Sequence, residues 1–488
     1  MVGGWPSEAA RILQQRTWGL LRNSLALAGT VSVLATALGL GSACWIASGP
    51  KRMKRIARAT FVAPLLIPPY VYALAWLALL RRDGLLNRSL IAVFGVSVSP
   101  YGFFPAAVVL SLVFSPIVIL LALSTLDSIE SSLIEAAQIL DDPHGVWRRV
   151  VLPLALPAIL AGMGLTFALT LVEYGVPALL EFNVYSMEIH AEFSQTGDPV
   201  AAMRLALPLL IPAAVLVALS QLGQGRTPLR ARPGGCPALR ALQLPFGLSA
   251  WGRASVLVLA IAVLVPVIVL SAQARTVAAV WQASRAASQE IRLSLTLALG
   301  VALAATLLSV TSSRVLSRSR RGWLWALHAL PLTIPAPLYA IGLIHLCNRP
   351  LPVAIYGTPF MLLLAHTGRF LPHSTLALVT QFRRVDPTLH EAARMHEVGW
   401  HRRTFRVHLP LLARGLIASA GIVFALSLGE LGASLLVVPP GSATLSLRLF
   451  NLLHYGASQS VAGLALAGLA LTALAGAATL WLLRRSQS

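Results

Sequence analysis

Charged side chains are scarce in this chain, and acidic ones are the scarcest. Only 11% of the 488 residues are Asp, Glu, Lys or Arg, and 17 residues are acidic. A soluble domain carries about a quarter charged residues. Hydrophobic residues make up 57% of the chain. The balance excludes an ordinary soluble domain and predicts an all-α polytopic membrane protein, because lipid cannot hydrogen-bond exposed backbone groups.

The residues needed for several chemistries are also missing. The three cysteines, Cys44, Cys236 and Cys347, follow neither a disulfide nor a metal spacing, so the sequence predicts no metal site and no resident cofactor. Lysine occurs only as Lys51 and Lys54, each followed by Arg. Because a P-loop requires Gly-Lys-Ser/Thr to hold phosphates, the chain cannot be a P-loop ATPase by itself.

The net charge of +21 indicates membrane topology and not a nucleic-acid partner, because the basic residues lie in short connections between apolar segments. Most of them fall in alternate loops, beginning with the loop that holds Lys51 and Lys54. This bias predicts an inner-membrane protein with an external N-terminus and a cytoplasmic C-terminus. The eleven predicted spans are 23–47, 59–80, 105–125, 155–178, 205–222, 254–272, 292–313, 323–346, 357–380, 411–436 and 461–483.

An internal repeat runs through the chain. Six pairs of similar segments keep the same order, at offsets between 256 and 270 residues. They are 22–28 with 292–298, 64–68 with 331–335, 114–116 with 370–372, 135–137 with 391–393, 152–153 with 409–410, and 173–175 with 430–432. An even number of predicted spans separates each pair, so the halves are expected to be parallel repeats with a pathway between them. The predicted organisation is a first half at 1–222, a cytoplasmic linker at 223–253 and a second half at 254–488.

The most informative sequence motif is a loop that occurs in both halves on the predicted cytoplasmic side. Each copy begins Glu-Ala-Ala, at Glu135 and Glu391, and ends Leu-Pro, at Pro153 and Pro410. Helix formers open each copy, two alanines make a smooth patch, and Gly or Pro ends the helix. The pattern predicts a short docking helix for another protein; the alternative is a plain interfacial helix that links two spans.

These features resemble the binding-protein-dependent ABC importer permeases, whose cytoplasmic signature begins Glu-Ala-Ala and ends in a hydrophobic residue and Leu-Pro. The resemblance covers nearly the whole chain and implies the type I ABC importer permease fold. It also implies a separate cytoplasmic ATPase, expected in two copies, and a periplasmic binding protein as partners, with ATP used by the ATPase. In the family this loop is the coupling helix that sits in a groove of the ATPase. The residues that take this role by resemblance are Glu135, Ala136, Ala137, Asp141, Pro153, Glu391, Ala392, Ala393, Glu397, Gly399 and Pro410.

The loops depart from the family pattern at one position, and the first loop is also one residue shorter before its Pro. The family has Gly six residues after the Glu, where this chain has Asp141 and Glu397. Asp tolerates a left-handed turn better than Glu does, and Gly145 or Gly399 could supply the bend instead. The departure therefore concerns the geometry of the turn more than the docking.

Within the family the chain looks most like the ferric-iron branch. The fused arrangement, the Pro-Leu-x-Ile-Pro segment and the Glu-Leu-Gly-Ala-Ser text at Glu430 carry this likeness. Thiamine permeases share the fused form, and a phosphonate or a polyamine is a further alternative substrate. Fold-level resemblance does not settle a ligand.

Three of the charged residues within predicted spans are candidates for a role in transport: Glu173, Glu430 and Arg369. Glu173 and Glu430 occupy matched positions, so a carboxylate pair could line the outer mouth of a pathway for a cation; alternatively, each lies at a helix end among lipid headgroups. Arg369 has no counterpart in the first half, and it pairs either with a carboxylate or carbonyl or with substrate.

Two other classes of protein, a membrane enzyme and a secondary transporter, explain fewer of these sequence features. A membrane enzyme would need a nucleophile, paired carboxylates or a metal cluster at the interface, and none is visible. A secondary transporter would also have repeats, but it has no use for two docking loops.

Overall fold

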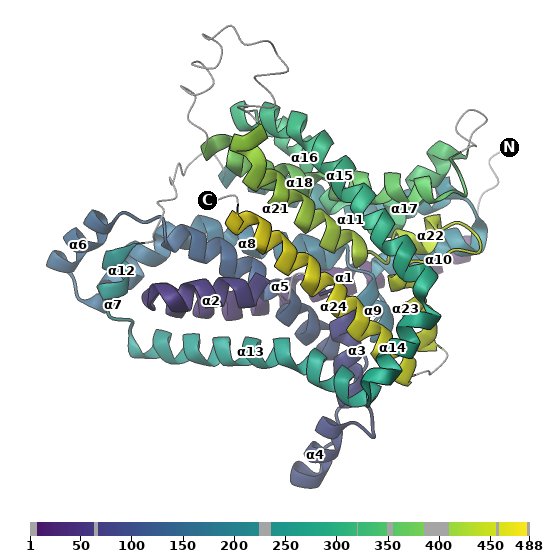
Figure 1. Ribbon diagram of the computed structural model, residues 1–488, viewed down its shortest axis with the longest axis horizontal. Helices are drawn as coiled ribbons and strands as arrows, with labels where there is room; N and C mark the ends of the chain where they lie inside the picture. The colour runs from purple at the N-terminus through teal and green to yellow at the C-terminus, as the bar shows by residue number, and fades with distance from the viewer. Residues whose placement is uncertain are drawn as a thin grey trace, which may run out of the picture. The chain divides into compact units, whose positions relative to one another are not determined.

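The computed structural model consists of helices and no strands across residues 7–62, 67–223, 236–319, 321–348, 355–384, 409–454 and 458–485, which are the residues it describes. The chain forms two compact units, Met1–Ala272 and Gln273–Ser488, whose helices are labelled in Figure 1. The predicted all-α class is therefore confirmed.

The first unit is built around α1, α5 and α8, which pack against one another. Their sequences are apolar almost throughout, and α5 buries most of its side chains. The described helices of this unit are α1 (Ser7–Ser48), α2 (Lys51–Val62), α3 (Pro69–Leu80), α4 (Leu85–Phe94), α5 (Phe103–Leu126), α6 (Ser131–Leu140), α7 (Pro143–Val146), the π-helix η2 (Trp147–Val151), α8 (Leu152–Leu171), α9 (Gly175–Leu179), α10 (Tyr185–Thr196), α11 (Pro199–Gly223), α12 (Pro237–Ala241) and α13 (Phe246–Ala274).

The second unit has a matching centre, made of α15, α18 and α21. Among the described residues its helices are α14 (Val277–Ala286), α15 (Ser288–Arg318), α16 (Gly322–Thr333), α17 (Ala336–Cys347), α18 (Pro359–Arg384), α21 (Leu409–Leu428), α22 (Ser434–Val437), α23 (Leu445–His454) and α24 (Ser458–Arg485).

The two units repeat the same packing. In the first, α3 contacts α9 and α10 contacts α11; in the second, α17 contacts α22 and α23 contacts α24. One buried hydrogen bond is also repeated: the Tyr185 amide donates to Ser24 Oγ at 2.8 Å, and the Leu445 amide donates to Ser294 Oγ at 2.8 Å. The helix pairs and the hydrogen bond both support the predicted duplication.

The predicted count of eleven spans is not confirmed. Among the described residues, seven helices are long and apolar enough to cross a membrane, or eight if the pair α16 and α17, bent by 100°, counts as one. The seven are Thr17–Ser48, Phe103–Leu126, Pro143–Leu171, Phe246–Ala274, Ser288–Arg318, Leu409–Leu428 and Gln459–Leu483.

The remaining predicted spans lie on helices that are short or polar. The span expected at 59–80 falls on two helices, α2 and α3, and the 12 residues of α3 reach only about 18 Å at about 1.5 Å per residue. The span expected at 205–222 lies on α11, whose apolar part is a shorter helix, Pro199–Val215. The span expected at 357–380 lies on α18, which is 26 residues long but carries Arg369, His366 and His373.

The helix predicted to lead the second half, α13, belongs in space to the first unit. It crosses α1 where both helices have glycine: a Cβ on Gly41 would meet Trp251 at 2.9 Å, and one on Gly252 would meet Trp45 at 2.6 Å. The close approach needs both glycines. The predicted boundaries, 1–222, 223–253 and 254–488, describe the duplication and stay a prediction.

Candidate functional site

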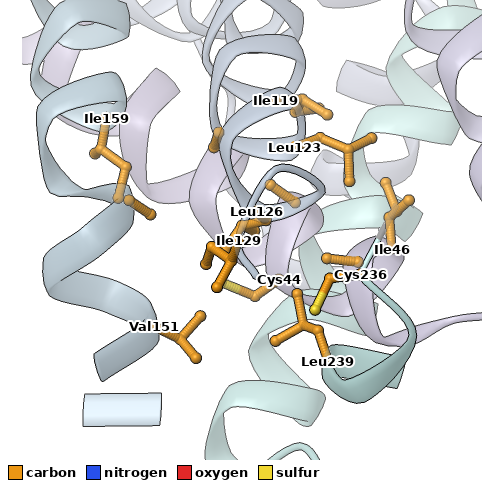
Figure 2. Close-up of a cluster of buried hydrophobic side chains, with 14 of the residues drawn as sticks. Cys44, Ile46, Ile119, Leu123, Leu126, Ile129, Val151, Ile159, Cys236 and Leu239 are labelled. Carbon is orange, nitrogen blue, oxygen red and sulfur yellow. The ribbon is translucent and has the colours of Figure 1, made fainter. Parts of the chain in front are cut away.

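Helix α6 carries the first copy of the Glu-Ala-Ala text and is fixed by one buried side chain, Ile134. Ile134 is fully buried in an apolar cluster that also includes Leu126, Trp147 and Leu239. Figure 2 shows part of this cluster, to which α12 contributes Leu239. Because α12 also packs against α6, the predicted linker helps to hold α6 in place.

The opposite face of α6 is exposed and largely apolar. Glu135 and Ala136 are exposed, while Ala137 is half-buried against the cluster. Ile139 and Leu140 are 84% and 88% exposed. Large apolar side chains gathered on a short exposed helix mark an interaction surface. We call this surface, Glu135–Ala136 with Ile139–Leu140, the α6 face.

The turn after α6 is not left-handed. Asp141 has extended backbone, with φ −148° and ψ 155°, and Gly145 lies within α7. Neither residue has a positive φ. The expectation that Asp141 or Gly145 would supply a left-handed bend is therefore wrong for this loop. Because any residue adopts extended backbone, the missing family glycine at position 141 is no obstacle to the turn.

Side chains in the turn hold it in place. Asp142 caps α7 by accepting a hydrogen bond from the Gly145 amide at 2.9 Å, which lowers the pKa of Asp142. Arg149 pairs with Asp141, with Nη1 2.9 Å from Oδ2. A Cβ on Gly145 would collide with the Asp141 carboxylate. A larger residue at position 145 would therefore displace the Asp141 carboxylate that pairs with Arg149.

A π-helix, η2, connects the loop to α8. Trp147 opens η2 and is 1% exposed, which ties the loop to the buried cluster. Pro153 follows as the second residue of α8, and Pro410 has the same place in α21. Glu391, Ala392, Ala393, Glu397 and Gly399 lie outside the described residues, so their docking role stays a prediction.

An ion pair that was not foreseen joins α2 to the end of α5. Lys54 Nζ lies 2.6 Å from Asp127 Oδ1, and the two side chains are only 8% and 10% exposed. The second half has Arg383 where the first has Asp127, and Arg383 stacks over the Trp325 ring of α16 at 5.3 Å. The same junction is thus held by an ion pair in one unit and by a cation–π contact in the other.

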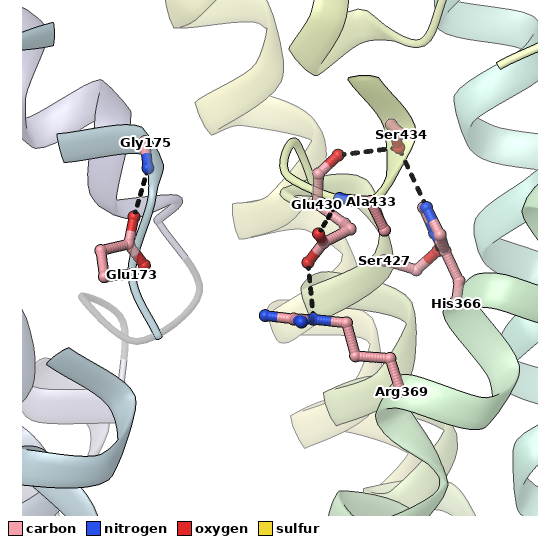
Figure 3. Close-up of polar contacts among 8 residues, drawn as sticks. All are labelled: Glu173, Gly175, His366, Arg369, Ser427, Glu430, Ala433 and Ser434. Carbon is pink, nitrogen blue, oxygen red and sulfur yellow. Dashed lines mark hydrogen bonds and ion pairs between the residues drawn. The ribbon is translucent and has the colours of Figure 1, made fainter. Parts of the chain in front are cut away.

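Glu173 and Glu430 have the same local role in their two units. Glu173 Oε1 accepts from the amides of Gly175 at 3.1 Å and Val176 at 3.4 Å, at the start of α9. Glu430 Oε1 accepts from the Ala433 amide at 2.9 Å, just before α22. Figure 3 shows both arrangements. Each carboxylate therefore stabilises the first turn of a short helix.

Glu430 also pairs with Arg369 of α18, with Nε 3.2 Å from Oε2. Glu430 is 8% exposed, and Arg369 Nη1 is buried without an acceptor among the described residues. The expectation that Arg369 could pair with a carboxylate is confirmed. Nearby, His366 bridges Ser427 and Ser434 at 2.9 and 3.0 Å (Figure 3). No group of three His, Cys, Asp or Glu side chains in the described part of the chain could hold a metal ion.

Residues 35–220 match the family described as binding-protein-dependent transport system inner membrane component. The chain is 34% identical over 237 residues to the molybdenum transport system permease protein ModB of Mycobacterium tuberculosis, which covers 46% of this chain and 85% of that protein. The chain belongs to this family. It is a membrane-embedded permease, a transport subunit and not an enzyme, and the resemblance to type I ABC importer permeases is confirmed.

Two other relatives extend the range of substrates. The permease is 28% identical over 213 residues to the ferric transport system permease protein FbpB of Actinobacillus pleuropneumoniae, covering 42% of this chain and 31% of that protein. It is 31% identical over 182 residues to a protein named as a 2-aminoethylphosphonate transport system permease, PhnU, of Salmonella paratyphi A, covering 36% of this chain and 62% of that protein. The family match includes α6 and Glu173.

Proposed function

We propose that this permease imports a small solute by coupling to a separate ATPase that docks on the α6 face and on the matched loop of the second half. The observation that supports it is the α6 face itself, which exposes Ile139 and Leu140 beside Glu135 and Ala136. Buried Ile134 and the Asp141–Arg149 pair fix the helix, so force on α6 would pass to α5 and α8.

A periplasmic binding protein would deliver the solute on the other side of the membrane. ATP closing the two ATPase copies would draw the two docking loops together, a switch between two states biased by ligand. The orientation with an external N-terminus and a cytoplasmic C-terminus remains part of the proposal. A cysteine at Ser194 should then react with reagents from the periplasm, and one at Gly235 only after the inner membrane is opened.

For the solute we propose an inorganic ion, with ferric iron first. The match covers only 31% of the ferric relative, so that protein is much longer than a single permease half, as is this fused chain. Molybdate is the second candidate, because the molybdenum relative has the higher identity, 34% against 28%. That relative is matched over 85% of its length and so corresponds to one half of this chain.

Uptake by the reconstituted complex separates the two candidates. Vesicles that hold the permease with its ATPase would be supplied with the binding protein and with radiolabelled iron(III) or molybdate. Saturable accumulation of iron with no accumulation of molybdate supports the first proposal, and the reverse supports the second. Accumulation of 2-aminoethylphosphonate or thiamine alone would contradict both.

We further propose that Glu173 and Glu430 lie along the solute pathway, with Arg369 balancing the charge of Glu430. Glu173→Gln with Glu430→Gln keeps hydrogen-bonding capacity but removes both charges. Uptake of iron(III) should fall about tenfold at equal protein abundance, which corresponds to ~1.4 kcal/mol in the barrier. Uptake of an anion should not fall.

A matched variant separates charge loss from an unpaired arginine. Glu430→Gln leaves Arg369 without its carboxylate, whereas Arg369→Gln with Glu430→Gln removes both members of the pair. If Arg369→Gln with Glu430→Gln regains parental uptake, the effect of Glu430→Gln alone comes from the unpaired Arg369. The two carboxylates would then be structural caps and not pathway residues.

A further inference from the structure

The first half contains a helix, α4, that has no counterpart among the described residues of the second half. The repeat offset is 267 at the Pro-Leu-x-Ile-Pro segment (64–68 with 331–335) and 256 at the next anchor (114–116 with 370–372), so 267 − 256 = 11 residues are added between these points. The added residues fall between α3 and α5, and α4, Leu85–Phe94, lies there. The second half is thus 11 residues shorter at the place where the first half has α4.

Helix α4 is held in a defined position. Asn87, 1% exposed, donates to the carbonyls of Leu80 at 3.0 Å and Val98 at 3.2 Å, and it accepts from the Val98 amide at 3.0 Å. Gly95 ends the helix with φ 67°, in the left-handed region that favours glycine. These contacts join the end of α3 to the segment after α4, so α4 is a fixed projection.

Apolar side chains make up most of the exposed surface of α4, which Arg88 and Ser89 interrupt. Leu85, Val93 and Phe94 are 68%, 70% and 71% exposed, and Ile91 is 45% exposed. More apolar side chains are exposed close by; they are Leu86, Val96, Val98, Tyr101 and Phe104. Figure 1 shows α4 standing clear of the other helices of its unit, beyond the end of α3. An exposed helix surface that is mostly apolar favours an apolar environment.

The position of α4 in the chain places it at a membrane surface. It directly follows α3 and precedes α5, whose 24 residues extend about 36 Å at about 1.5 Å per residue, enough to cross a bilayer. Because α6 follows the other end of α5, α4 and the α6 face lie on opposite sides of the membrane. Three exposed arginines flank or belong to α4; they are Arg81, Arg82 and Arg88.

We propose that α4 is an interfacial anchor, embedded in the lipid leaflet opposite the α6 face, with Arg81, Arg82 and Arg88 among anionic headgroups. Apolar surface with flanking arginines is the composition of helices that lie in this zone of a bilayer. A soluble partner that binds and leaves would return the same apolar surface to water in every cycle. Lipid covers it permanently.

An environment-sensitive label tests the anchor in the full-length protein. The native cysteines are buried, so a cysteine at Phe94 can be labelled selectively with the NBD fluorophore. In vesicles of phosphatidylcholine and phosphatidylglycerol, without any binding protein, its emission should be blue-shifted and quenched by doxyl-labelled lipids. Ser194 is exposed near the end of α10, and a label there should emit as in water.

Two variants with the same label check the chemistry. Ile91→Ser with Val93→Ser should return the emission to that of water, and neither change disturbs a buried side chain. Arg81→Gln, Arg82→Gln and Arg88→Gln together should keep the insertion but abolish its dependence on the phosphatidylglycerol content. Emission as in water from the Phe94 position in vesicles overturns the proposal. A blue shift only after the binding protein is added would identify α4 as a protein-docking surface instead.

Discussion

Replacing both Glu135 and Glu391 by arginine is expected to abolish copurification of the ATPase with the permease while leaving the permease in the membrane. Glu135 is exposed on α6 and makes no contact that the fold needs, so the change acts on the docking surface. Each single variant should retain part of the binding, because each loop is proposed to contact its own ATPase copy. The measurement is the yield of ATPase recovered with tagged permease.

The matched control is Glu130→Arg. Glu130 is an exposed glutamate in the same loop, at the start of α6, and the substitution makes the same change in charge. It should leave copurification close to the parental yield. Undiminished copurification with the Glu135 and Glu391 double variant would show that the α6 face does not dock the ATPase.

Breaking the buried ion pair between α2 and α5 should destabilise the first unit strongly. Asp127→Asn leaves the Lys54 ammonium, in a side chain that is 8% exposed, next to a neutral partner in place of the carboxylate at 2.6 Å. Removing one member of a buried pair costs about 3–5 kcal/mol. The measurement is the unfolding temperature of the purified permease in detergent.

Removing both charges should restore most of this stability. Lys54→Met with Asp127→Asn removes both members of this pair, and neutral replacement of a buried pair is often close to thermodynamically neutral. If Asp127→Asn alone unfolds at the parental temperature, the pair contributes little and the α2–α5 junction is held by apolar packing.

The sequence was informative where local chemistry decides the structure. The repeated Glu-Ala-Ala text predicted an exposed helix in the first loop, and α6 has its alanines and glutamate on or near its outer face. The collinear anchors predicted matching halves, and the Ser24 and Ser294 hydrogen bonds recur at the same helix junction. These features depend on residues close together in the chain or on direct comparison of its two halves.

Other features depend on packing that the sequence does not state. Lys54 and Asp127 are 73 residues apart, so their pairing requires the relative register of α2 and α5. The predicted count of eleven spans stays unconfirmed; in the predicted span 323–346, for example, α16 and α17 are separate helices that meet at a bend of 100°, which the apolar sequence does not show. The turn at Asp141 was mistaken because the family glycine suggested a left-handed residue.

Dependence of uptake on ATP tests the central proposal most directly. Vesicles that contain the permease and its separately purified ATPase would be loaded with ATP or with a non-hydrolysable analogue, and supplied with the binding protein and labelled iron(III) or molybdate. Accumulation should require ATP, the ATPase and the binding protein together, and it should be lost with the Glu135→Arg, Glu391→Arg double variant. Equal accumulation by the permease alone, driven by a proton or sodium gradient without ATP, would contradict the account and identify a secondary transporter.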